Sequence, residues 1–252
     1  MEEVAQVTEP IGQARSMRQQ TDLRIRRRTV MRWSVAVIVV LVVLSTAGQL
    51  LTISVESGPS HNAAQWVWLD SEQSLPAWIQ STALLICGLI LYIIGRLKRL
   101  DKTGPTRAWF ALSLLFVGLA VDESTAVHER VSWPLRRLLG GPDIFHFGWV
   151  VLGLAVVLVV FLSSIRFLSA LDAPTRWMFL GAGGLYVSGA LGVEMLGAAH
   201  VARNTMQNLA YTIGYVTVEE VLEMAGITVF LLTLLSYLAN NYGDVTLHLD
   251  FS

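Results

Sequence analysis

The chain of 252 residues is 54% hydrophobic and only 15% charged, with a formal net charge of −1 and a mean hydropathy of +0.55. These values are typical of a polytopic membrane protein, and we expect no nucleic-acid partner. The single cysteine, Cys87, excludes an intrachain disulfide and a zinc site built on cysteines.

Six apolar segments each have the ~20 residues needed to cross a hydrocarbon core of ~30 Å. They are residues 33–54, 77–96, 108–128, 146–168, 176–199 and 209–238. The sequence therefore predicts an all-α protein, a bundle of six transmembrane helices within residues 33–238. A basic tail (1–32) and a short C-terminal tail (239–252) flank this domain. The first segment is too long for a signal peptide, so we expect an uncleaved anchor.

Positive charge is concentrated on one side of the predicted bundle. Of the 18 Lys and Arg residues, seven precede the first helix, five surround the loop after the second helix and two flank the loop after the fourth. Only four lie on the opposite side. By the positive-inside rule, both termini are predicted to be cytoplasmic. The expected location is a bacterial inner or plasma membrane.

The loops on the predicted outer side are long. Residues 55–76 include Trp66 and Trp68, and residues 129–145 predict a short amphipathic helix on the outer surface. Both segments serve either as anchors at the interface or as a lid over an outward-facing site. None of the seven prolines falls inside a spanning segment, so the helices are expected to be unbroken.

Carboxylates interrupt the third, fifth and sixth apolar segments. Counted from the cytoplasmic end of each helix, Glu123, Glu194 and Glu223 lie at ~24, ~27 and ~26 Å. Charged side chains are costly in hydrocarbon, so acids at a common depth predict one polar site inside the bundle. We also expect Glu123 to face Glu223 or Glu220 across a contact between the third and sixth helices. Gly184, Ser188 and Gly192 form a stripe suited to close helix packing.

A divalent metal ion (zinc, iron or manganese) is the leading explanation, because clustered carboxylates need a counter-charge. The predicted metal ligands are Asp122, Glu123, His146, Glu194, Glu219 and Glu223. His128 or Glu220 is predicted to act as the catalytic base for a metal-bound water. The alternatives are acids that are merely solvated or paired with arginines, a metal-free proton site, and a haem held by two histidines.

The predicted function is a metal-dependent integral membrane enzyme that acts on a lipid or membrane-soluble substrate at the outer leaflet. The reaction is hydrolysis, or oxygen chemistry if the metal is redox-active. Histidines and acids at the helix ends, such as His128 and Glu129, make the layout similar to that of ceramidase-like membrane hydrolases. The chain lacks their His-x-x-x-His element, so no residue role follows from the likeness. A proton- or ion-coupled transporter and a structural subunit of a larger membrane complex are the alternatives. Expected partners are membrane lipids and a further copy or complex partner.

Overall fold

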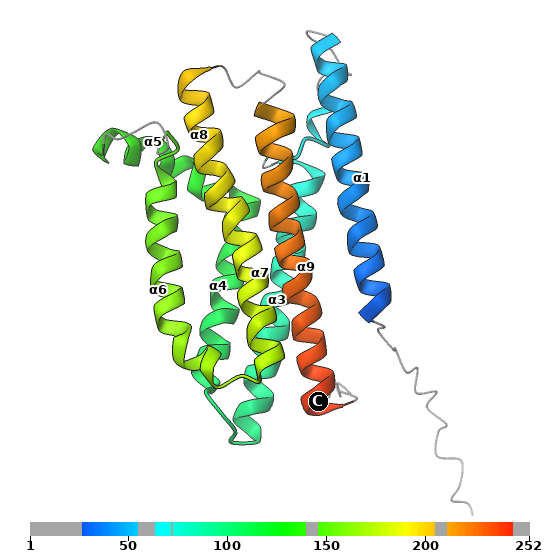
Figure 1. Ribbon diagram of the computed structural model, residues 1–252, viewed down its shortest axis with the longest axis vertical. Coiled ribbons are helices and arrows are strands. Elements are labelled where there is room, and N and C mark those ends of the chain that lie inside the picture. Colours follow the sequence, from blue (N-terminus) through cyan, green and yellow to red (C-terminus); the bar gives the residue numbers. More distant parts are fainter. Residues whose placement is uncertain (1–26, 55–63, 72, 140–145, 205–210, 244–252) are drawn as a thin grey trace, which may run out of the picture.

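A computed structural model describes residues 27–54, 64–71, 73–139, 146–204 and 211–243, and every regular element in these ranges is helical (Figure 1). The elements are α1 (Arg27–Ser54), α3 (Leu75–Leu100), α4 (Thr106–Thr125), α5 (Val127–Leu139), α6 (Trp149–Ser169), α7 (Ala173–Val187), η2 (Ser188–Val193), α8 (Glu194–Arg203), η3 (Tyr211–Val216) and α9 (Thr217–Tyr242). Six helical segments are long and apolar enough to cross a membrane, with α7, η2 and α8 forming one of them. The six predicted helices are thereby confirmed.

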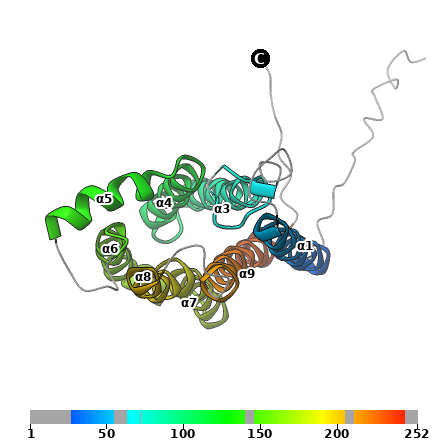
Figure 2. The ribbon, with the colours of Figure 1, turned by 90° about the horizontal axis from the view of Figure 1, so that it is seen from above.

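The helices stand in two rows when the bundle is seen from above (Figure 2). One row contains α5, α4 and α3, and the other contains α6, α8, α7, α9 and α1. The closest packing is of α3 on α4 and of α7 on α9, while α3 also contacts α9 and so joins the rows. The amphipathic segment after the third helix is confirmed as α5, which crosses one end of the bundle rather than running along it (Figure 1).

An aromatic cluster holds the rows together in the half of the bundle where α4 begins and α9 ends. Trp109 of α4 is only 1% exposed, and its ring lies 4.9 Å from the ring of Phe167 and 4.9 Å from that of Tyr237. Nearer the middle, the rings of Phe116 and Phe230 stack at 4.5 Å. Aromatic pairs of this kind add about 0.5–1.5 kcal/mol beyond the area that they bury. This half therefore anchors α4, α6 and α9 without polar contacts between their rings.

Two glycines let α7 and η2 approach α9. A Cβ atom on Gly226 would meet the backbone N of Tyr186 at 2.7 Å, and one on Gly189 would meet the backbone O of Glu219 at 2.7 Å. Any larger residue at either position would push the helices apart. The predicted packing stripe is wrong, because a Cβ atom on Gly184 or Gly192 would meet nothing within 4 Å.

The expectation of unbroken helices is also wrong in detail. A π-helical segment, Ser188–Val193, lies directly before Glu194, and a second, Tyr211–Val216, lies directly before Thr217. Such widened turns need no proline and occur often at functional sites. The third predicted helix ends early as well, because Ala126 has a left-handed backbone with φ of 53°.

Candidate functional site

The end of the bundle opposite the aromatic cluster contains a cleft of about 680 Å³ between the two rows of helices. All eight residues that the sequence singled out line this cleft: Asp122, Glu123, His128, His146, Glu194, Glu219, Glu220 and Glu223. The acids that lie far apart along the chain are therefore brought together, as their common height predicted. Their individual roles stay predictions.

Asp122 and His128 form the first pair in the cleft. The left-handed residue Ala126 turns the chain sharply between α4 and α5, and this turn brings His128 back to the end of α4. Asp122 Oδ1 accepts a hydrogen bond from the backbone N of His128 at 2.9 Å, and Asp122 Oδ2 lies 2.9 Å from His128 Nδ1. A carboxylate at Nδ1 favours the tautomer with the proton on that nitrogen. The turn thus orients the imidazole and makes its Nε2 basic.

Glu194 and Glu219 form the second pair. The two carboxyl groups lie close enough to interact. Ionised carboxylates accept but do not donate hydrogen bonds, so a hydrogen bond between the two groups needs a proton on one of them. Trp149 Nε1 donates a further hydrogen bond to Glu194 Oε1 at 3.1 Å, and the ring of Trp149 lies 4.9 Å from that of His128. Trp149 therefore lies between the Glu194–Glu219 pair and the Asp122–His128 pair.

Gln80 links the remaining acids and was missed by the sequence reasoning. This residue of α3 is 2% exposed, and its Nε2 donates to Glu223 Oε2 at 2.8 Å. The same amide hydrogen-bonds Glu123 of α4. Glu123 and Glu223 thus meet through an amide from a third helix rather than directly. A lone glutamine inside an apolar helix was the available signal, since a buried polar group needs a partner.

The segment before α3 also reaches the cleft, where Leu69, Asp70 and Ser71 form part of its wall. Ser45 of α1 holds this segment in place by accepting a hydrogen bond from the backbone N of Leu69 at 3.0 Å. The side chain of Asp70 is exposed to the cleft, but the surrounding walls of the cleft limit its contact with bulk water. This desolvation, followed by the charges of Glu194 and Glu129, raises the pKa of Asp70 to about 7. The position of Leu69, Asp70 and Ser71 in the wall favours the interpretation of the loop 55–76 as a lid over the site. Residues 55–63 of that loop lie outside the described part of the chain.

Basic groups in the cleft are few. Arg136 of α5 is the only Lys or Arg that lines it within the described ranges, and its Nη1 lies 3.2 Å from His146 Nε2. Arg137 stacks instead on the ring of Trp133, with its Cζ 3.3 Å from the ring centroid. Neutralisation of the acids by arginines, one of the alternatives from the sequence, therefore finds little support at Arg136 and Arg137.

The predicted metal site is not supported either. Within the described residues, no group of three or more His, Cys, Asp or Glu side chains is placed to hold a metal ion. The physical reason is that the acids are engaged in separate contacts. Asp122 pairs with His128, Glu194 with Glu219, and Glu223 with Gln80.

Six apolar helices and a carboxylate-lined cleft at one end indicate an integral membrane protein of the helical-bundle class. Residues 34–238 match the model of a family described as a domain of unknown function (DUF8692), and the chain belongs to that family. No curated protein and no solved structure matches the chain.

Proposed function

We propose that the protein is an integral membrane enzyme that acts by acid–base chemistry on a lipid or another membrane-soluble substrate in this cleft. The observation that supports it best is the Asp122–His128 contact of 2.9 Å, which lies beside two neighbouring carboxyl groups that can share a proton, Glu194 and Glu219. An oriented imidazole and a nearby protonated acid are the two groups that general acid–base catalysis requires.

In this proposal His128 takes a proton from a water molecule or from a hydroxyl group of the substrate, and Asp122 stabilises the imidazolium that forms. The Glu194–Glu219 pair then returns a proton to the leaving group. Glu220, which also lines the cleft, is the alternative base. Trp149 holds Glu194 in place through its indole N–H and so positions the acid relative to His128.

The zinc, iron or manganese ion expected from the sequence stays a prediction, and no step of the proposal depends on it. Metal analysis of the purified protein tests that prediction directly. A proton- or ion-coupled transporter has weaker support, because the space that continues from the cleft toward the other end of the bundle is lined by apolar residues apart from Ser164 and Tyr186. An ion crossing the bundle would find almost no ligands there.

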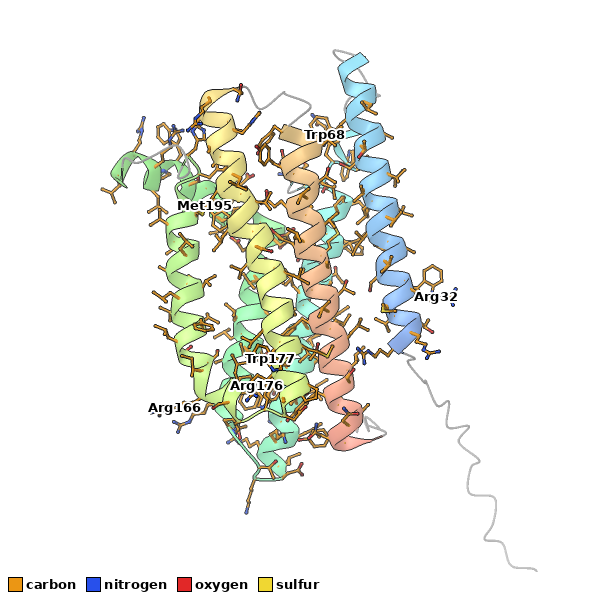
Figure 3. All side chains as sticks on the ribbon, viewed as in Figure 1. Arg32, Trp68, Arg166, Arg176, Trp177 and Met195 are labelled. Carbon is orange, nitrogen blue, oxygen red and sulfur yellow. The ribbon has the colours of Figure 1, made fainter. Side chains whose placement is uncertain are left out.

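We further propose that the cleft opens at the outer leaflet of a bacterial inner membrane, with both termini cytoplasmic. Arg166 and Arg176 lie toward the end of the bundle opposite Met195, the neighbour of Glu194, and Arg32 lies on the part of α1 that is nearer to that end (Figure 3). This charge asymmetry supports the orientation. A cysteine at Thr103 in a Cys87→Ala background should be protected from an impermeant thiol reagent added outside the cell, and labelling there would reverse the orientation.

The test of function compares two histidine variants in nanodiscs made with a bacterial lipid extract. Mass spectrometry follows which lipids the wild-type protein consumes and which products appear. His128→Gln should lower the rate at least ~10²-fold, the usual contribution of a general base. His200→Gln is the matched control, because His200 lies at the same end of the bundle but does not line the cleft. Equal rates for wild type and His128→Gln, or a defect of the same size in His200→Gln, would overturn the proposal.

A further inference from the structure

An apolar cavity of about 410 Å³ continues from the acidic cleft into the middle of the bundle, between α4, α6 and α7. The two spaces share part of their walls: Leu119, Val156, Val157, Tyr186 and Val187 line both. A polar cleft and an apolar cavity with a common wall form one site with two chemically different ends.

The cavity is long compared with the thickness of a membrane. Its lining on α6 runs from Val156 to Leu168, twelve residues or ~18 Å along the helix, which is more than half of a ~30 Å hydrocarbon core. Gly183 and Gly184 of α7 also line it, and a Cβ atom on either would meet nothing within 4 Å. Such a space, without charged side chains in its described lining, suits a hydrocarbon chain.

The polar end has an excess of hydrogen-bond acceptors and negative charge. Eight carboxyl side chains line the cleft, against one arginine and two histidines within the described residues. Gln80 lies behind this wall and does not line the cleft; it is 2% exposed and its Nε2 is bonded to Glu223, one of the lining acids. Ionised carboxylates only accept hydrogen bonds, so a ligand that fits among them supplies N–H donors and positive charge. An anionic headgroup would be repelled.

We propose that the site binds an amphiphile with one hydrocarbon chain and a protonated amine headgroup. The headgroup lies among the carboxylates near Glu223, and the chain passes Val156 and Tyr186 into the apolar cavity. This inference rests on the proposed function, for which it names the substrate class. The single cavity selects one chain, and the acidic cleft selects an amine over a phosphate or a carboxylate.

Binding of radiolabelled hexadecylamine to the purified full-length protein in neutral detergent micelles tests the inference. Unlabelled hexadecylamine should displace the label. Hexadecanoate has the same chain and the opposite charge, and ethylamine has the same headgroup and almost no chain. Each of these two competitors should require at least tenfold higher concentrations to displace the label. Val156→Trp should weaken binding at least tenfold, because the indole would fill the passage between cleft and cavity. Val159→Trp is the matched control on the same helix, since Val159 is 65% exposed and lines neither space.

If hexadecanoate displaces the label as strongly as hexadecylamine, the site does not select a positively charged headgroup. If Val156→Trp and Val159→Trp bind hexadecylamine equally well, its hydrocarbon chain does not pass Val156 into the apolar cavity. The outcomes also separate this inference from the proposed function. If hexadecylamine binding depends on Val156 but no lipid conversion depends on His128, the binding site is supported and the proposed enzymatic function is wrong. If an anionic lipid is converted in a reaction that depends on His128, the enzymatic function is supported and the selection of an amine is wrong.

Discussion

The two ends of the bundle differ in the side chains that fill them, which are aromatic at one end and acidic at the other. Around Trp109 the interior consists of aromatic rings at 4.9–6.1 Å from one another, whereas around Glu223 it consists of carboxyl groups held by an amide, a histidine and an indole. Packed aromatic rings stabilise a fold with little cost in desolvation, but buried acids must be stabilised by their neighbours. The comparison teaches that stability is concentrated at one end and chemistry at the other, and the predictions below test this division.

The largest effect is expected at the aromatic end. Trp109→Ala would remove a ring that is 1% exposed and contacts Phe167, Phe179 and Tyr237. Such a truncation costs about 3–5 kcal/mol, so the midpoint of thermal unfolding in detergent should fall sharply. Trp177→Ala is the control, because Trp177 lies toward the same end but is 67% exposed, and its midpoint should hardly change (Figure 3). Similar midpoints for the two variants would show that the rings near Trp109 do not anchor the bundle.

At the acidic end, Glu223→Gln should affect function and stability in different ways. Glu223 is 7% exposed and accepts a hydrogen bond from Gln80, so losing its charge should lower substrate turnover about 10- to 100-fold. The midpoint of unfolding should stay constant or rise, because a buried charge is removed. Glu129→Gln should lower turnover less than about fivefold, since Glu129 is exposed. If both variants lose turnover equally, depth in the cleft is not what matters.

The coupling of α4 and α9 through Gln80 can be measured with a double-mutant cycle. Glu123→Gln and Glu223→Gln each disturb an acid bonded to the same amide, so their effects on turnover should not add. Interaction energies of about 0.5–3 kcal/mol are typical of residues in one network. The free energies of activation of the two single variants and the double variant provide the measurement. Effects that add within ~0.5 kcal/mol would mean that Gln80 does not couple the acids.

The smallest expected effect concerns pH. The pKa of Asp70 is raised to about 7, so its side chain is neutral below that pH and becomes negative above it. Hexadecylamine stays protonated throughout, as amines of this type titrate near pH ~10.4. Its affinity should therefore increase about two- to fivefold between pH 6 and pH 8, the amount expected for a partly exposed ion pair. Asp70→Asn should reduce this increase, and an unchanged pH profile in that variant would show that Asp70 is not its source.

The sequence by itself determined the elements and the height of the acids. Crossing a ~30 Å hydrocarbon core requires ~20 apolar residues, so composition alone locates each helix. Because the rise per residue is constant, the positions of Glu123, Glu194 and Glu223 along their helices follow from counting. The amphipathic pattern of residues 129–145 likewise identified α5. These properties depend only on distance along the chain.

Only the tertiary structure decided which groups meet. The π-helical segment Ser188–Val193 changes the direction of every side chain that follows it, and the left-handed turn at Ala126 brings His128 back to Asp122. Helical periodicity assumes a regular turn and cannot anticipate either feature. The partner of Glu223 is Gln80, 143 residues away in the chain, because α3 packs against both α4 and α9. Contacts of this kind depend on how helices pack side by side, and the order of residues within a helix does not specify its neighbours.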